Sequence, residues 1–216
     1  MQKAVRVFRF SLLGSGSSGN AALVMSDRAK ILIDDGFSLK QLQTRVEAVG
    51  ESLDGLQGVF LTHEHSDHVA GLGVLCRKTG VTVYATAATL ENLPPQVGEL
   101  PKVEAVEAGD TIVVGDMEVT SFSVAHDAGD PVSYTIQRNG AKLGFATDFG
   151  HASALVRTRL SHSHALVVEA NYCPEMLRHG KYPPQVQQRI RGRMGHMSNQ
   201  DMTKLLDHLL HEGLRT

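Results

Sequence analysis

The stretch His63-Glu64-His65-Ser66-Asp67-His68 decides the fold, because it places three imidazoles and a carboxylate within six residues. The apolar residues Val59–Leu61 before it predict a short buried strand, and the residues after it predict a helix over His68–Thr79 that Gly80 ends. Neutral imidazole and carboxylate are ligands that borderline divalent metals prefer. In an extended segment His63 and His65 project to the same side, so they can chelate one ion while Asp67 and His68 reach a second. The stretch therefore predicts a metal-binding loop at the carboxyl end of a strand.

Strands and helices alternate around this loop. Ala21–Met25 and Lys30–Ile33 predict a hairpin, Ser38 caps a helix that Gly50 ends, and Val81–Tyr84 completes a βαβ unit. The remaining predicted strands are Val5–Leu13, Val103–Val106, Ile112–Val114, Met117–Val124, Val132–Gln137, Lys142–Ala146 and Ala165–Glu169, and the remaining helices are Ala152–Leu160, Pro184–Gly192 and Asn199–Glu212. The pattern predicts an α/β fold in which helices pack outside two mixed sheets, with residues 1–216 forming one domain.

Composition excludes several classes of protein. Lys and Arg total 21 against 23 Asp and Glu, so the net charge of -2 provides no global attraction for nucleic acid. Apolar runs fall short of the roughly 20 residues that span a bilayer, and Met1–Lys3 leads into alternating strand residues, so we expect a cytoplasmic protein with no membrane partner. The two cysteines, Cys76 and Cys173, form no Cys-x-x-Cys pair, which argues against a zinc ribbon or a disulfide framework.

The motif is the His-x-His-x-Asp-His signature, and the chain resembles the metallo-β-lactamase superfamily. Ile33-Asp34, the motif, His126 and Thr147–Gly150 follow the order of that superfamily's elements. The segments THEHSDHVAGLGVL, EANYCPEML and GRMGHMSNQD are similar to the WalJ (YycJ) branch, whose members are associated with DNA exonuclease activity, and PhnP-type cyclic phosphodiesterases are related to it. The resemblance implies an αββα sandwich.

The resemblance also implies a site with two divalent metal ions, with zinc or manganese expected. One ion would be held by His63, His65 and His126, the other by Asp67 and His68, and Asp148 would bridge them. Two such ions lower the pKa of a shared water until hydroxide exists near neutral pH. Asp67 would thus be catalytic as well as a ligand, and Asp34 would orient the ligand loop from the second layer.

One family feature is missing from the sequence. The superfamily usually supplies a further metal-binding histidine after a late strand, and this chain stops at Leu214-Arg215-Thr216, where that strand would begin. We therefore expect the domain to lack its last strand and loop. Either residues beyond 216 complete the site, or water or His196 fills it and the second metal binds more weakly. His196 resembles the substrate-facing histidine of the phosphodiesterase branch and is predicted to be catalytic.

Several polar residues are candidates for substrate binding. Gly14-x-Gly16-x-x-Gly19 matches a dinucleotide fingerprint, but strand and turn follow it where a Rossmann fold needs a helix. We interpret it as a tight loop whose Ser17, Ser18 and Asn20 donate to substrate, with Asn171 as a further candidate. Arg189, Arg191 and Arg193 form either a solvated helix end or a phosphate clamp, and a neighbouring metal site favours Arg191 and Arg193 as clamp residues.

The leading hypothesis is a metal-dependent hydrolase, a phosphodiesterase or exonuclease on DNA that uses a metal-bridging hydroxide. Its partner would be nucleic acid or a small phosphodiester. A thioesterase of the glyoxalase II kind would use nearly the same ligands, and a cyclic-nucleotide-type phosphodiesterase or a metal-binding module without turnover also fits. The arginine row favours phosphate over a thioester. The sequence leaves the native metal and the oligomeric state open.

Overall fold

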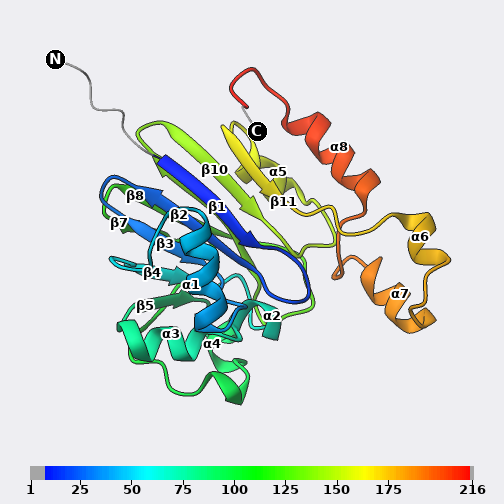
Figure 1. The fold of residues 1–216 in the computed structure, drawn as a ribbon. Helices are drawn as coiled ribbons and strands as arrows, with labels where there is room; N and C mark the ends of the chain where they lie inside the picture. Colours follow the sequence, from blue (N-terminus) through cyan, green and yellow to red (C-terminus); the bar gives the residue numbers. More distant parts are fainter. Residues whose placement is uncertain (1–7, 215–216) are drawn as a thin grey trace. The chain divides into compact units, whose positions relative to one another are not determined.

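The computed structural model describes residues 8–214, which divide into two compact units. Within that range the first unit comprises residues 8–107, 112–118 and 128–130, and the second comprises residues 108–111, 119–127 and 131–214. The strands form two mixed sheets, one of six and one of five strands, accompanied by helices (Figure 1). This confirms the predicted α/β class with two mixed sheets.

The six-stranded sheet has the order β1-β2-β3-β4-β5-β6. Three antiparallel strands, β1 (Phe8–Gly14), β2 (Ala21–Ser26) and β3 (Lys30–Ile33), are followed by three parallel ones, β4 (Gly58–Phe60), β5 (Thr82–Ala85) and β6 (Val103–Ala105). Of the predicted strand over Val5–Leu13, residues 5–7 lie outside the described range. Ile33 pairs with Phe60, so the residues that follow β3 and β4 emerge at the same sheet edge.

The first unit has its own core. Leu42 and Val46 of α1 (Leu39–Ala48) and Leu72 and Leu75 of α3 (Leu72–Thr79) are fully buried in a cluster with alternate residues of the sheet, among them Leu23. A capping box between Ser38 and Gln41 starts α1, as its sequence predicts. The two helices thus pack against the sheet from which the metal-binding motif emerges (Figure 1).

The helix predicted over His68–Thr79 is wrong in its start and its continuity. Two helices replace it, α2 (Ser66–Val69) and α3, separated by Ala70-Gly71. A Cβ atom on Gly71 would lie 1.7 Å from the Phe37 carbonyl oxygen, so only glycine fits at this position beside the loop after β3. The Gly71 N–H donates to the Asp35 carbonyl at 2.9 Å, which ties this loop to the break.

The five-stranded sheet has the order β11-β10-β9-β8-β7. Its strands are β7 (Thr111–Val114), β8 (Met117–Ser123), β9 (Val132–Arg138), β10 (Ala141–Ala146) and β11 (Ala165–Val168). Asn139-Gly140 forms the predicted two-residue hairpin turn between β9 and β10, with φ angles of 49° and 83°. Because β10 and β11 are parallel and Ala146 pairs with Val168, Asp148 and Glu169 follow neighbouring strand ends.

Helices α5 (Ala154–Leu160) and α8 (Asn199–Leu209) form the core of the second unit with this sheet. Val156, Leu160 and Leu205 are buried there with Phe122 and Phe149. Ser198 caps α8 as predicted, accepting from the Asp201 N–H at 3.0 Å, and α7 spans Pro184–Ile190. Three short helices escaped sequence analysis, α4 (Ala87–Glu91), η1 (Pro95–Val97) and α6 (Pro174–Arg178). Within residues 8–214 no helix has the length and apolar character needed to cross a membrane.

Candidate metal centre

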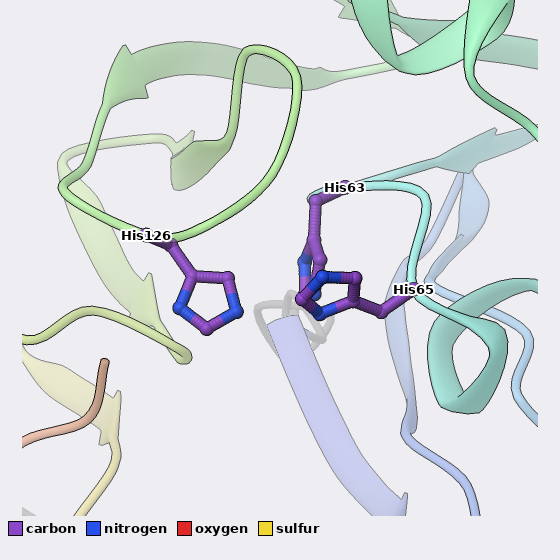
Figure 2. A group of neighbouring side chains, drawn as sticks. All are labelled: His63, His65 and His126. Atoms are coloured by element: carbon purple, nitrogen blue, oxygen red, sulfur yellow. The ribbon is translucent and has the colours of Figure 1, made fainter. Parts of the chain in front are cut away.

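The first unit presents the metal-binding motif on the loop that follows β4 and on α2, which contains Asp67 and His68. His63 and His68 are buried, and His65 and Asp67 are half-buried. The ring of His63 lies 4.5 Å from that of His65 and 4.1 Å from that of His68, measured between centroids. Figure 2 shows the first of these pairs, with His65 edge-on to His63. The structure therefore brings the three imidazoles of the motif together, as their spacing predicts.

Asp34 sets the tautomers of two of these histidines. Its carboxylate accepts from the Thr62 hydroxyl and from His68 Nδ1, each at 2.8 Å, and from the Thr62 N–H at 2.8 Å. Because the Thr62 hydroxyl proton is committed to Asp34, the Thr62 oxygen accepts from His63 Nδ1, which lies 3.0 Å away. Both imidazoles thus keep Nε2 as the nitrogen suited to bind a metal, the arrangement that metal-binding histidines usually need.

Asp34 adopts a rare backbone conformation to do this. Its φ is 59°, in the left-handed region that costs a non-glycine residue free energy and clusters at functional sites. The next residue, Asp35, is fully buried, and burial raises its pKa to about 7. The Phe37 backbone N–H offsets part of that rise in the Asp35 pKa, while the charge of Asp34 adds to it.

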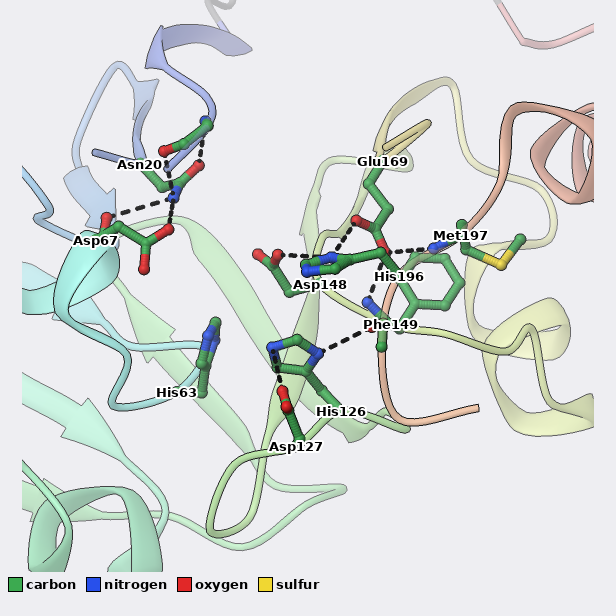
Figure 3. Close-up of polar contacts among 12 residues, drawn as sticks. Asn20, His63, Asp67, His126, Asp127, Asp148, Phe149, Glu169, His196 and Met197 are labelled. Carbon is green, nitrogen blue, oxygen red and sulfur yellow. Dashed lines mark hydrogen bonds and ion pairs between the residues drawn. The ribbon is translucent and has the colours of Figure 1, made fainter. Parts of the chain in front are cut away.

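The glycine-rich loop closes onto the motif through Asn20. The Asn20 amide donates to Asp67 Oδ2 at 3.1 Å and lies 3.0 Å from His68 Nε2, so it contacts the ligand atoms themselves (Figure 3). Its Oδ1 accepts from the Gly16 N–H at 2.9 Å, which fixes the turn. Ser17 and Ser18 lie exposed on this turn. Of the three predicted substrate donors in this loop, Asn20 is thus engaged with the metal motif.

In the second unit, His126 follows β8 and is buried. Its Nδ1 donates to the Gly195 carbonyl at 3.1 Å (Figure 3), which leaves Nε2 as the nitrogen suited to bind a metal. The same holds for His63 and His68. Burial lowers the pKa of His126, although the charges of Asp148 and Asp127 and the Gly195 carbonyl partly oppose the change. A lowered pKa keeps the imidazole neutral, the form that binds metal.

Asp148, Glu169 and His196 form a second acid–base cluster in the same unit. Each offers an atom within 4.8 Å of the others, a grouping able to hold a cation. His196 Nδ1 lies 3.0 Å from Glu169 Oε2 and 3.3 Å from Asp148 Oδ1 (Figure 3). Asp148 also has a left-handed φ, 53°, in the loop after β10. The structure thus places the predicted residues Asp148 and His196 side by side.

Glu169 is a residue that sequence analysis missed. Its other oxygen, Oε1, accepts from the backbone N–H of Phe149 at 2.7 Å and of Met197 at 3.0 Å, so it ties the loops of Asp148 and His196 together. Burial alone would lower the pKa of His196, but the hydrogen bond and charge of Glu169, with the charges of Asp148 and Asp127, raise it. Glu169 was missed because it lies near Asp148 only through the parallel pairing of β10 and β11, which the sequence does not reveal.

The predicted phosphate-binding residues lie on the loops around His196. Arg191 and Arg193 are exposed, and Asn171 is exposed with its N–H donating to the Met197 carbonyl at 3.0 Å. Arg189, from the same row, forms an ion pair with Asp127, whose Oδ1 lies 3.4 Å from His126 Nε2. Arg189 is therefore engaged within the protein, whereas Arg191 and Arg193 face solvent.

Known proteins resemble this chain in sequence and in fold. Residues 29–213 match the family described as "Beta-lactamase superfamily domain". The chain is 39% identical over 194 residues to a Bacillus anthracis protein named "Exodeoxyribonuclease YycJ", covering 89% of this chain and 74% of that one. It is 35% identical over 199 residues to "Exodeoxyribonuclease WalJ" of Streptococcus pneumoniae, covering 90% and 74%. The crystal structure of Zn²⁺-bound PqqB from Methylobacterium extorquens superposes with a TM-score of 0.64 at 21% identity, over 83% of this chain and 66% of that one.

The fold and the clustered histidines and carboxylates therefore define a metallo-hydrolase class, and the chain belongs to the β-lactamase superfamily domain family. Within that superfamily it falls in the YycJ/WalJ-like branch. The resemblance drawn from the sequence is thus confirmed at both levels.

Proposed function

We propose that this chain is a metal-dependent phosphodiesterase that removes nucleotides from the ends of DNA. One observation carries the proposal, namely a histidine held by a buried glutamate next to a candidate metal-binding aspartate, in the cluster of His196, Glu169 and Asp148. Hydrolysis of a phosphodiester needs a proton for the leaving oxygen, and such a histidine can provide it. The exodeoxyribonuclease names of relatives with 39% and 35% identity favour DNA as the substrate.

We infer a site of two divalent ions, zinc or manganese. His63, His65 and His126 would hold one, Asp67 and His68 the other, and Asp148 both. The donor set fits such ions, because His63, His68 and His126 each commit Nδ1 to a hydrogen bond and keep Nε2 for a ligand bond. When bound, the ions would neutralise charge on the phosphoryl group and make water a nucleophile near neutral pH.

His196 would act as the general acid. Burial opposes protonation of His196, but the hydrogen bond and charge of Glu169 outweigh it and raise the pKa, which favours the cationic form. Glu169 also fixes Nδ1, so that Nε2 can deliver the proton to the leaving oxygen. Glu169 in turn is fixed by two backbone N–H groups, so it orients His196 without touching the substrate. We expect His196 to serve this role and not to act as a metal ligand.

Substrate would be held by Ser17, Ser18, Asn171, Arg191 and Arg193, with Asn20 holding the metal motif as well. Exposed guanidinium groups match phosphate oxygens, and the net charge of -2 requires such local contacts. We also propose that the protein works in the cytoplasm.

The test replaces Asp67 or Asp148 with asparagine in zinc- or manganese-loaded protein. Each change alters a half-buried proposed ligand and leaves the apolar core intact, so we expect hydrolysis of bis-p-nitrophenyl phosphate and of 5′-phosphorylated DNA to fall at least 100-fold. Asp207→Asn, on the exposed face of α8, is the matched control and should keep full activity.

Near-normal turnover by either ligand variant would contradict the assignment. Cleavage of a glutathione thioester but of no phosphodiester would favour the glyoxalase-like alternative, and cleavage of cyclic nucleotides but of no DNA would favour a small-molecule phosphodiesterase. Tight metal binding without hydrolysis of any of these substrates would indicate a metal-binding module.

A further inference from the structure

A hollow in the second unit begins one residue after Glu169. Its volume is about 410 Å³, and the segments that line it run from Ala170 to Leu177 and from Gly180 to Tyr182, with Asn199. A smaller hollow of about 150 Å³ shares Tyr172 and Leu177 with it, and its lining also includes Arg178 and Arg191. Neither the metal-binding motif nor the His196 cluster accounts for these two hollows.

The wall of the larger hollow is joined to the proposed acid by backbone hydrogen bonds. The Asn171 N–H donates to the carbonyl of Met197, the residue after His196, at 3.0 Å. Tyr172 forms a parallel bridge with Ser198, and its carbonyl accepts from the Asn199 N–H at 2.9 Å. A ligand in the hollow would therefore be held at a fixed distance from His196 and Glu169.

The lining combines aromatic and apolar side chains with cations. Tyr182 is 58% and Met176 74% exposed, and both line the same hollow, so their apolar surfaces are adjacent and open to a ligand. Lys181 lines the same hollow, and Arg191 lies close enough to Tyr172 to lower the pKa of its phenol against the stronger opposing effect of burial. Aromatic faces interleaved with cations are typical of surfaces that bind single-stranded nucleic acid.

We propose that this hollow binds an unpaired nucleobase at the end of a DNA strand, stacked on Tyr182 and lined by Tyr172. Lys181 and Arg191 contact the flanking phosphates. The inference rests on the proposed function and deepens it, because it assigns single-stranded ends as the substrate class. In a duplex an internal base is stacked on both faces and a terminal base is still held by its pairing partner, so only an unpaired or frayed base can enter the hollow beside Tyr182. A volume of about 410 Å³ suits a ligand of nucleoside size.

The test measures the affinity of zinc-loaded full-length protein for a phosphorothioate-linked single-stranded oligonucleotide by fluorescence anisotropy. Tyr182→Ala should weaken binding roughly 5- to 100-fold, the usual effect of losing one base–aromatic stack. Tyr182→Phe should bind like the parent protein, and Tyr182→Leu should bind like Tyr182→Ala. Leu210→Ala, which removes an exposed apolar side chain at the end of α8, is the matched control and should change nothing.

Salt dependence separates stacking from charge. Tyr182→Ala should lower affinity without changing the slope of log affinity against log salt, whereas Lys181→Ala should make that slope shallower by about 0.7, the value for one phosphate contact on a single strand.

Four results would overturn the inference. The first is that Tyr182→Ala binds the oligonucleotide like the parent protein, and the second is that Tyr182→Leu and Tyr182→Phe bind it equally. The third is that the parent protein binds no oligonucleotide. The fourth is that the parent protein binds a blunt duplex as tightly as the single strand and with the same dependence on Tyr182. The second would point to an apolar surface for a protein partner. If oligonucleotide binding depends on Tyr182 but the protein cleaves no DNA, the proposed function is rejected and the role of the hollow is retained. If the protein cleaves DNA and neither binding nor cleavage depends on Tyr182, the proposed function is retained and the role of the hollow is rejected.

Discussion

Asp35 is a buried carboxyl group whose raised pKa makes the stability of the protein depend on pH. It is fully buried next to Asp34, and its pKa of about 7 lies far above the ordinary value of 3.8, mainly because burial disfavours the carboxylate. The native protein therefore binds a proton here that the unfolded chain has lost. Stability conferred by that proton is complete below pH 3.8 and is lost as pH rises towards 7.

We therefore expect Asp35→Asn to stabilise the metal-free protein increasingly as pH rises. The difference in unfolding free energy between variant and parent should grow by about 1.4 kcal/mol per pH unit between pH 5 and 7 and then level off, because asparagine cannot ionise. Urea unfolding in the presence of a chelator at pH 5, 6, 7 and 8 measures this. A difference that does not depend on pH would mean that Asp35 titrates like an exposed carboxyl group.

Single residues also mark the limit of sequence analysis. The imidazoles of the motif were predictable because their spacing fixes their direction on one loop. Asp34 was expected to orient that loop, and its contacts with Thr62 and His68 agree. Glu169 looked like an ordinary strand-end residue, because its role arises from the parallel pairing of β10 and β11, which no local pattern encodes.

At the level of elements, periodicity predicted long strands and helices and failed where tertiary contacts interrupt them. The Asn139-Gly140 hairpin follows from residues that tolerate positive φ. At the break between α2 and α3 the Gly71 N–H donates to the Asp35 carbonyl and not to a carbonyl of the helix, a contact between residues distant in the sequence. Helices as short as α4, η1 and α6 contain too few residues for an apolar period to appear.

The loop after β10 stores strain in its backbone, since Asp148 has a φ of 53°. Alanine at this position would keep the strain, and glycine would remove it. Both substitutions delete the same carboxylate, so we expect Asp148→Gly to be more stable than Asp148→Ala by about 1 kcal/mol in metal-free protein.

The same pair of substitutions at Asp207, inside α8, is the control for this comparison. There alanine should be more stable than glycine by roughly 1 kcal/mol, because a helix favours alanine. Urea denaturation of the four variants gives both differences. If the alanine variant were the more stable one at both sites, the loop would adopt an ordinary φ in solution.

At the scale of the whole molecule, the proposed ligands come from both compact units. His65 belongs to the first unit, and His126 belongs to the second. If they share an ion, as we propose, that ion cross-links the units, and its binding free energy adds to the stability of the whole chain.

Zinc should therefore stabilise the protein in a way that needs both histidines. At free zinc 100-fold above its dissociation constant, we expect a gain of about 2.7 kcal/mol in unfolding free energy over the metal-free protein. His65→Ala and His126→Ala should each lose most of this gain, and to a similar extent, because either change leaves the ion one ligand short. His208→Ala, exposed on α8, should keep it. Chemical unfolding at buffered zinc concentrations tests the idea, and a full gain in His126→Ala alongside its loss in His65→Ala would mean that the first unit holds the ion alone.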